Sequence, residues 1–226
     1  EEGTTYHVRA YAVNANGTYY GEDLTFTTEA RTYHENHEYV DLGLSVKWAT
    51  ANIGENKPEK SGDYFAWGET SPKSNYDWST YLWCKHSDNM LESLTKYNTQ
   101  SDLGAVDKLT TLNLSDDAAK QNWGGDWRMP TAKEMYELLT QCDWEATATG
   151  YEVISRVNGK SIFLPAGGCM DKTSIFKPGE YGYYWSSGLV ENDAKNAHVL
   201  YFNAKDKYDS SISRSTGCFI RPVCPK

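Results

Sequence analysis

The chain has 226 residues, which is enough for one sizeable domain with a smaller piece beside it. Its net charge of −9 argues against nucleic acid and anionic lipid, because phosphate binding needs clustered Lys and Arg side chains, and no run of about 18 apolar residues is present to span a bilayer. Seventeen Tyr and eight Trp against six Phe favour rings that are buried while a polar group remains free for hydrogen bonding, as in β-rich extracellular folds and binding surfaces.

Residues 4–28, TTYHVRAYAVNANGTYYGEDLTFTT, predict two strands joined by a turn. Tyr6 and Val8 lie on one face of the first strand, and Phe26 belongs to the second. The turn NANG places Gly17 where a positive φ is favourable. A lone hairpin is marginal in water, so this piece needs further strands or must lie on the next domain.

Residues 29–38 are polar and without periodicity, which predicts a linker. His34 and His37 are three positions apart, a spacing that suits a metal site on a helix. Because no helix signal surrounds them, we expect solvated linker histidines.

From residue 39 the pattern changes. YVDLGLSVKWAT, residues 39–50, places apolar side chains at every second position and predicts a half-buried strand or tight hairpin. Residues 70–112 are polar with little periodicity and predict a long loop region. Three aromatic side chains are expected to hold this loop region: Trp78, Tyr81 and Trp83.

The segment DWRMPTAKEMYELLTQC predicts a helix of about 11 residues. Thr131 is a natural N-cap, and Glu134 completes a capping box. An apolar stripe follows at helical spacing: Met135, Leu138, Leu139 and Cys142. A shorter helix is predicted within 115–123, SDDAAKQNW, with Ser115 as its cap.

Short strands fill the rest of the chain. The pair Asn158-Gly159 in YEVISRVNGKSIFLP is a strong hairpin signal. YYWSS, AHVLYF and CFIRPV are three more strand candidates. Two helices among many short antiparallel strands predict the fold class α+β.

Six blocks occur in order: YVDLGLSVKWATANIG, GDYFAWGET, NWGGDWRMPTAKEMYELL, SIFLPAGG, YYWSS and GCFIRPV. Over residues 39–226 they resemble the Fibrobacter succinogenes major paralogous domain. The resemblance implies a C-type-lectin-like fold, related to the formylglycine-generating enzyme and found on secreted and surface-anchored bacterial proteins. TTYHVRAYAVNANG resembles the last hairpin of a fibronectin type III domain. We therefore expect an incomplete domain over 1–28, a linker over 29–38 and the C-type-lectin-like domain over 39–226.

Five cysteines leave at least one thiol free: Cys84, Cys142, Cys169, Cys218 and Cys224. Cys218 and Cys224 are close in sequence, and a bridge between them and two buried thiols are both open alternatives. Members of the family often carry Cys at the position of Ala51, and its loss here implies that Cys218 or Cys224 lacks that partner. No Cys or His spacing typical of zinc is present.

An oxidase like the formylglycine-generating enzyme needs two close thiols in an open cleft, and only Cys218 and Cys224 suggest such a pair. The Arg- and Ser-rich motif of that enzyme is missing around them. GxSxG, HExxH and Walker A sequences are also absent. We therefore expect no enzyme. Arg128 and Arg221, each inside an apolar block, are expected to anchor hydrogen-bond networks within the fold.

Residues 191–196, ENDAKN, contain hard oxygen donors that suit calcium: Glu191, Asn192 and Asp193. Sugar-binding C-type lectins add a Pro-containing loop to such a set, and that loop is missing here. A solvated loop without calcium is the reading we favour.

In NAHVLYFN, residues 196–203, both faces of the expected strand are apolar. By the family pattern Leu200 and Phe202 point inward, so Val199 and Tyr201 are expected to face outward as a recognition surface. The alternative is that a loop or the N-terminal hairpin covers them.

The segment 188–216 also resembles the display region of hypervariable C-type-lectin-like proteins. Tyr184 and Trp185 are expected in the core. The expected ligand-binding residues are Asn192, Asp193, Val199, Tyr201, Asn203, Tyr208 and Arg214.

Together with these patterns, the family resemblance implies a secreted or surface-displayed bacterial binding or adhesion module at the outer cell surface. We expect it to recognise a glycan or a protein through residues 188–214. The alternatives are an oxidase of the formylglycine-generating type and a structural or fimbrial subunit without a soluble ligand.

Overall fold

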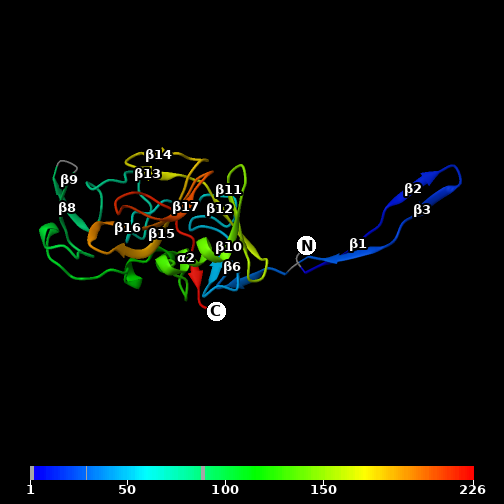
Figure 1. The fold of residues 1–226 in the computed structure, drawn as a ribbon, viewed down its shortest axis with the longest axis horizontal. Helices are drawn as coiled ribbons and strands as arrows, with labels where there is room; N and C mark the ends of the chain where they lie inside the picture. The colour runs from blue at the N-terminus through cyan, green and yellow to red at the C-terminus, as the bar shows by residue number, and fades with distance from the viewer. Residues whose placement is uncertain (1–2, 29, 88–89) are drawn as a thin grey trace.

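Figure 1 shows two parts of unlike shape, a slender ribbon that carries β1 to β4 and a broad body that carries the other elements. The computed structural model describes residues 3–28, 30–87 and 90–226. Two α-helices, α1 (Ala118–Trp123) and α2 (Ala132–Gln141), accompany strands that pair in antiparallel fashion. The fold class is therefore α+β, as predicted. None of the helices in the described ranges is long and apolar enough to cross a membrane.

The ribbon is one long hairpin with a break in each arm. Its strand segments are β1 (Thr5–Val8), β2 (Tyr11–Asn14), β3 (Gly17–Tyr20) and β4 (Leu24–Thr27). The segments pair β1 with β4 and β2 with β3, and Gly17 takes a positive φ at the turn, as predicted. Every residue of the four segments is exposed. The ribbon is therefore held by its own ladder and by exposed ring pairs such as Tyr6 on Phe26, whose centroids lie 5.4 Å apart.

Residues 32–38 are not a linker but part of a sheet in the body. This sheet has the order β18 (Val223–Cys224), β7 (Lys47–Ala49), β6 (His37–Val40) and β5 (Thr32–His34). The turn between β5 and β6 uses Glu35 and Asn36, both at positive φ. The linker prediction is wrong over these residues because an edge strand can carry polar side chains and need not show apolar alternation.

The two histidines of this hairpin lie against tryptophans. The His37 ring stacks on Trp123 with centroids 3.7 Å apart, and burial lowers the pKa of His37. His34 meets Trp127 edge-on at 5.6 Å, and the His34 carbonyl accepts a hydrogen bond from Trp127 Nε1. The prediction of solvated linker histidines is therefore wrong.

Helix α2 begins as the sequence predicts. Thr131 Oγ1 accepts a hydrogen bond from the Glu134 amide, and the Glu134 carboxylate accepts one from the Thr131 amide at 2.8 Å, which completes the capping box. Met135 and Leu138 bury the apolar stripe in the core. Arg128 pairs with the Glu134 carboxylate through both terminal nitrogens, so the expected network of this arginine is confirmed.

Helix α1 has a different cap from the one predicted. A 3-10 turn over Leu114–Asp116 precedes the helix, and Ser115 lies within that turn. Asp117 is the N-cap, and its carboxylate accepts hydrogen bonds from the amides of Lys120 and Met129. The helix therefore starts two residues later than a Ser115 cap requires.

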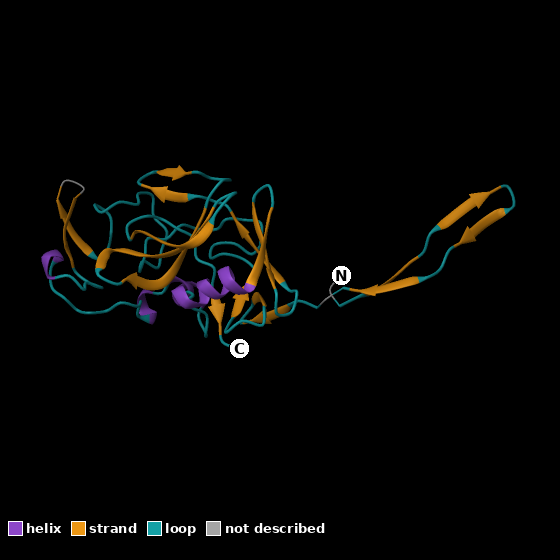
Figure 2. Ribbon diagram, in the orientation of Figure 1, coloured by secondary structure: helices purple, strands orange, loops and turns teal. Residues whose placement is uncertain are grey.

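Two three-stranded sheets form much of the body (Figure 2). One contains β10 (Cys142–Ala146), β11 (Gly150–Ser155) and β12 (Ser161–Pro165). The other contains β15 (Gly182–Val190), β16 (Asp193–Phe202) and β17 (Lys207–Ser213). The pair β13 (Cys169–Asp171) and β14 (Ser174–Phe176) lies beside them. The predicted Asn158-Gly159 hairpin is present between β11 and β12.

The core surrounds β16 on both sides. Leu200 and Phe202 belong to a cluster with Met135 and Leu138 of α2. Val199, one position away, belongs to a second cluster that includes Trp67 and Trp185. Successive residues of a strand point to opposite faces, so β16 is covered on both.

The strand candidates other than AHVLYF gave mixed outcomes. Tyr184 and Trp185 in β15 are fully buried, as predicted. In CFIRPV only Val223 lies in a regular strand, while Cys218 and Phe219 make isolated bridges. Arg221 is 1% exposed, and its guanidinium donates to Asn52 and to backbone carbonyls, which confirms its expected network.

The loop region 70–112 has few regular elements, and six of its described side chains are buried: Tyr76, Tyr81, Leu94, Tyr97, Asn98 and Leu112. It carries one hairpin, β8 (Cys84–Ser87) with β9 (Met90–Leu94), and a 3-10 turn over Ser101–Leu103. Tyr81 OH donates to the Trp67 carbonyl, and Trp83 Nε1 donates to the Gly68 carbonyl. These rings hold the loop region to the body, as predicted.

Candidate functional site

Four tyrosines cross the sheet β15-β16-β17 and are called the tyrosine row here: Tyr181, Tyr183, Tyr201 and Tyr208. The strand register places Tyr183 opposite Tyr201, and Tyr201 opposite Tyr208. Ring centroids lie 5.1 Å apart in the first pair and 4.9 Å apart in the second. Tyr181 adds a T-shaped contact with Tyr201 at 5.6 Å. The row is therefore one continuous aromatic surface built from three strands.

The row is exposed at its ends and packed in its middle. Tyr208 is 50% exposed, whereas Tyr201 is only 7% exposed. Tyr181 and Tyr183 are half-buried. Phe176 of β14, 48% exposed, meets the Tyr181 ring at 5.9 Å and lengthens the aromatic surface. A ligand would therefore meet Tyr208, Tyr181 and Phe176, with Tyr201 as the support beneath.

Two phenol groups of the row, those of Tyr183 and Tyr201, are held in the neutral form by burial. Burial raises the pKa of Tyr183 far above that of free tyrosine, and burial also raises the pKa of Tyr201. The Tyr201 hydroxyl accepts a hydrogen bond of 2.6 Å from Asn203 Nδ2. Neutral hydroxyls both donate and accept hydrogen bonds, so the row has apolar faces and polar edges.

A pocket of about 410 Å³ opens beside the row at Tyr181. Tyr151 and Phe202 line its inner part, and Thr147 and Ala148 from the turn between β10 and β11 line one wall. The Tyr151 hydroxyl donates to the Asn203 carbonyl at 2.9 Å and so joins this wall to β16. A mainly apolar pocket with a few polar groups is typical of small-ligand sites.

Gly182 makes the packing between the row and the pocket feasible. A Cβ at this position would lie 2.1 Å from the Phe202 ring, against which Gly182 pairs across β15 and β16. The segment YGYYW therefore needs glycine between its tyrosines, and a side chain there would displace Phe202 from the pocket wall.

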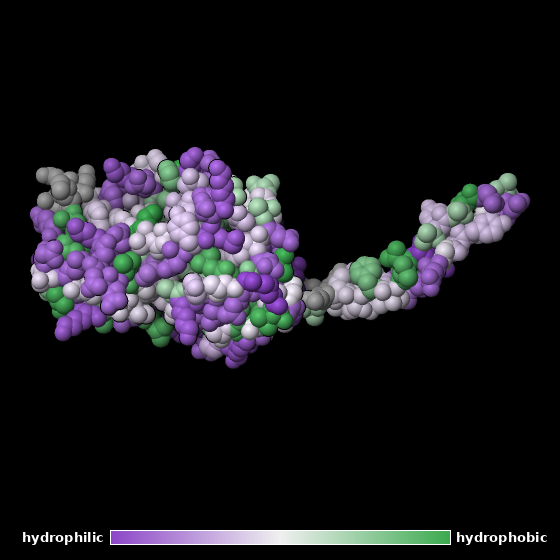
Figure 3. Space-filling view, in the orientation of Figure 1, coloured by the Kyte–Doolittle hydropathy of each residue, from purple (hydrophilic) through white to green (hydrophobic). Residues whose placement is uncertain are grey.

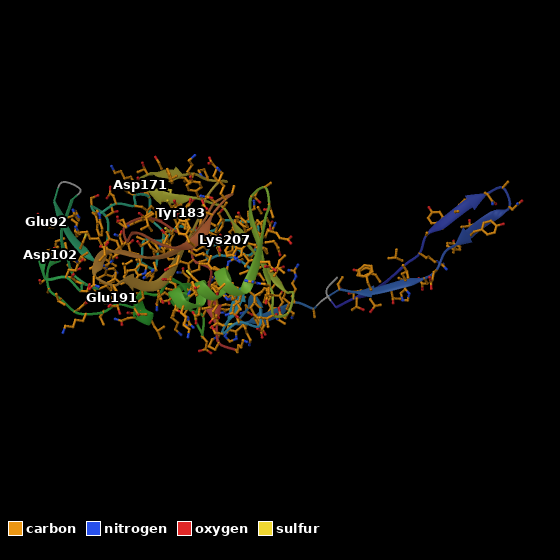
Figure 4. The ribbon with its side chains drawn as sticks, in the orientation of Figure 1. Glu92, Asp102, Asp171, Tyr183, Glu191 and Lys207 are labelled. Atoms are coloured by element: carbon orange, nitrogen blue, oxygen red, sulfur yellow. The ribbon has the colours of Figure 1, made fainter. Side chains whose placement is uncertain are left out.

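Two charged side chains border the pocket. Glu180 and Lys205 line it, and Glu180 pairs with Lys177 at 3.0 Å. Lys177 Nζ also lies 5.8 Å from the centre of the Tyr181 ring. Figure 4 labels Tyr183 and Lys207 on the same sheet. The site thus has the Glu180 carboxylate and the Lys205 ammonium group at the pocket, and the Lys177 ammonium group near the Tyr181 ring.

Two of the expected ligand-binding residues are not open to a ligand as predicted. Val199 is fully buried and Tyr201 nearly so, because the second core cluster covers the face that we expected to be open. Asn203 is half-buried and lines the pocket, and its Oδ1 accepts hydrogen bonds from the amides of Lys205 and Asp206. Tyr208 is exposed, as the surface prediction requires.

Arg214 was predicted at the surface and is fully buried. Its Nε donates to the Tyr81 hydroxyl at 2.8 Å, and its terminal nitrogens donate to the carbonyls of Lys96, Tyr97 and Ala194. The guanidinium carbon also lies 5.0 Å from the centre of the Trp67 ring. Arg214 therefore holds the loop region 70–112 to β16 and is not available to a ligand.

The calcium candidates form an exposed turn between β15 and β16. Asn192 adopts a positive φ of 64°, and Glu191 is exposed. The Asp193 carboxylate accepts hydrogen bonds from the Lys195 amide and from Asn196 Nδ2 at 2.6 Å. Among the residues that the structure describes, no three His, Cys, Asp or Glu side chains converge as a metal site.

All five cysteines are free thiols in the structure. Cys218 and Cys224 belong to different core clusters, the one with Trp185 and the one with Trp127. Burial raises the pKa of both thiols. A thiolate pair in an open cleft is therefore not formed by these two residues.

The functional candidates that the sequence analysis missed are Tyr183 of β15 and Tyr181, which directly precedes that strand. YGYYW places Tyr181 and Tyr183 two positions apart, which puts both on one face of a strand. That spacing was available as a signal, but the pairing of Tyr183 with Tyr201 depends on the strand register. Comparison with protein-family models, with curated proteins and with solved structures gave no match for this chain.

Proposed function

We propose that this chain is a secreted or surface-displayed binding module of C-type-lectin-like fold, which recognises a glycan at the tyrosine row and the adjoining pocket. The observation that carries this proposal is the in-register aromatic surface that ends at a 410 Å³ pocket. Sugar rings combine an apolar C–H face with hydroxyl edges. Tyrosine side chains, each with an apolar ring and a hydroxyl group, match both properties.

Size favours a glycan over a protein partner. A stable protein interface covers about 800 Å² on each side around a central apolar core. Here the centre of the row is already packed, since Tyr201 is 7% exposed. The open part is Tyr208, Tyr181 and Phe176 beside a pocket whose volume falls within the range of about 300–1,000 Å³ typical of small ligands.

A formylglycine-generating type of oxidase is the other reading of the family resemblance. Its chemistry needs accessible thiolates, and Cys218 is fully buried with a pKa raised well above that of a free thiol. Low thiolate content and lack of access both disfavour nucleophilic sulfur chemistry. The binding module is therefore the better supported proposal.

The test is a glycan screen with the full chain, followed by calorimetry on the best ligand. Tyr208→Ala should weaken binding about tenfold, because one stacking ring is lost. Tyr136→Ala is the matched control, since Tyr136 is 59% exposed on α2 and lies outside the site. Tyr201 is unsuitable for this test, because its burial means that truncation also perturbs the fold.

Equal binding by the Tyr208 and Tyr136 variants would contradict the proposed site. Binding only to proteins in a parallel screen would replace the glycan with a protein partner. Repeating the titration with a calcium chelator shows whether the turn at Glu191 takes part.

A further inference from the structure

Cys169 of β13 faces Cys218 of the last segment across a short antiparallel bridge. Met170 and Gly217 exchange two backbone hydrogen bonds, of 2.7 Å from the Met170 amide and 2.9 Å from the Gly217 amide. Cys169 precedes Met170 and Cys218 follows Gly217, so the antiparallel register places the two cysteines directly opposite each other.

The neighbouring hydrogen bonds define the type of pair. Cys218 exchanges its own amide and carbonyl bonds with Phe65, on the side away from β13. Cys169 pairs in register with Phe176 of β14, on the side away from Gly217. The two cysteines are therefore a non-hydrogen-bonded pair, in which opposite Cα atoms lie about 4.5 Å apart. Disulfides span Cα separations of about 4.4–6.8 Å.

Both side chains point to the same side of this small sheet. Cys169 and Cys218 are 3% and 0% exposed, and both belong to the core cluster that contains Phe65 and Trp185. Burial raises the pKa of Cys218 and Cys169 adds to this rise, and both thiols add to the rise that burial causes in the pKa of Tyr64. Register, backbone spacing and shared burial thus agree.

We propose that Cys169 and Cys218 form a disulfide that links β13 to the final segment of the chain. The structure holds both residues as thiols, which is the reduced form. The other three cysteines remain thiols, because Cys224 lies opposite Lys47 on β7 and Cys142 lies opposite Ser155 on β11. Cys84 likewise pairs with Leu94 in the hairpin β8-β9.

The oxidation requires a small-molecule disulfide such as oxidised glutathione. One cysteine thiolate attacks that disulfide and releases one glutathione thiol. The second cysteine then attacks the mixed disulfide, forms the Cys169–Cys218 bond and releases the other glutathione thiol. Two electrons and two protons pass from the protein to the oxidant. Because both thiols are buried in the folded chain, this exchange belongs to folding, before the cluster closes.

The cross-link encloses the sheet that carries the tyrosine row. β15, β16 and β17 all lie between residues 169 and 218 in the chain. Tyr183 is close to both sulfurs, and the two thiols raise its pKa beyond the effect of burial. The Cys169–Cys218 disulfide would restrain the tyrosine row near Tyr183, away from its exposed end at Tyr208.

The test uses the full chain refolded in a mixture of oxidised and reduced glutathione, then alkylated under denaturing conditions and digested with trypsin. The expected product joins peptide 161–172 to peptide 215–226, with a mass lower by two hydrogen atoms than the sum of the two. Peptide 215–226 contains Cys218 and also Cys224. The product must therefore persist in Cys224→Ser and disappear in Cys218→Ser.

A second measurement uses the unchanged sequence. The oxidised chain should melt about 10 °C above the same chain kept in a phosphine reductant, because the bond closes a long loop in the unfolded state. Five alkylated cysteines after oxidative refolding, a bond between Cys218 and Cys224, or equal melting temperatures with and without reductant would each overturn the proposal. None of these results depends on glycan binding.

Discussion

The ribbon and the loop region 70–112 reverse the usual relation between regular structure and burial. The ribbon is mostly strand, yet every residue of its strand segments is exposed, and Figure 3 shows hydrophobic side chains lying open along it. The loop region is mostly irregular, yet Tyr76, Tyr81 and Tyr97 are buried. Strand hydrogen bonds alone stabilise a hairpin marginally, whereas buried side chains with satisfied polar groups stabilise a loop strongly.

The largest expected effect is on the loop region and comes from Arg214→Met. The change leaves the Tyr81 hydroxyl and the carbonyls of Lys96, Tyr97 and Ala194 without their buried donor. We expect the free energy of unfolding to fall by about 3–5 kcal/mol, measured by urea denaturation.

Arg9→Met in the ribbon is the matched control for that variant. Arg9 is exposed and lies over the Tyr20 ring at 4.1 Å. Its replacement should change the free energy of unfolding by less than about 1 kcal/mol. Similar losses for the two arginines would mean that burial does not distinguish the two regions.

A smaller effect is expected from Asp116, which fixes the end of the loop region. Burial opposes ionisation of this carboxyl, but hydrogen bonds from Lys96, Tyr97 and Ser115 lower its pKa overall. The stabilisation is therefore complete above the ordinary aspartate pKa of 3.8 and is lost as the pH falls through the lower value of the folded chain.

Asp116→Asn tests this linkage. The variant should be about 2 kcal/mol less stable at pH 7, because hydrogen bonds to a charged acceptor are lost. The difference from the parent chain should shrink as the pH is lowered below 3.8. A difference that is constant with pH in urea unfolding would exclude a contribution from the charge of Asp116.

The smallest effect is expected from removing the ribbon, residues 1–28. Its strand segments are fully exposed, and the strand pairings that the structure describes for them lie within the ribbon, so the body should lose less than about 0.5 kcal/mol of unfolding free energy. Thermal and urea unfolding of the shortened chain provide the measurement. A loss of several kcal/mol would show that the ribbon packs on the body.

Local signals predicted the elements that depend on neighbouring residues. The capping box of Thr131 and Glu134 and the hairpin at Asn158-Gly159 involve residues a few positions apart, so their pattern is visible in the sequence. The burial of Tyr184 and Trp185 followed from their place in an apolar run. The α+β class followed from counting such elements.

What covers each face of a strand could not be predicted in the same way. Alternation along β16 separates Leu200 from Val199, but it does not show that Trp67, more than a hundred positions away, covers the Val199 face. For Arg214 the sequence shows a charge near polar residues. Its acceptors are backbone carbonyls from distant segments, and carbonyls are present at every position, so no sequence pattern indicates them.

The tyrosine row lies between these two cases. YGYYW indicated that Tyr181 and Tyr183 share a face, and VLYF indicated that Tyr201 lies in a strand. The register that aligns Tyr183, Tyr201 and Tyr208 depends on two strand pairings with turns of different length. The sequence therefore shows which tyrosines share a face of a strand, but not how they align across the sheet.

The anchoring of Arg214 also governs how the molecule opens. The Arg214 guanidinium donates to the carbonyls of Lys96 and Tyr97 and to that of Ala194 on β16. The loop region 70–112 therefore cannot detach from β16 without breaking these hydrogen bonds. The backbone amides of the loop region should therefore exchange with solvent only in large cooperative openings. The backbone amides of the ribbon should exchange through frequent local openings. In this protein, resistance to local unfolding therefore depends more on the buried Arg214 guanidinium than on whether a segment is a regular strand.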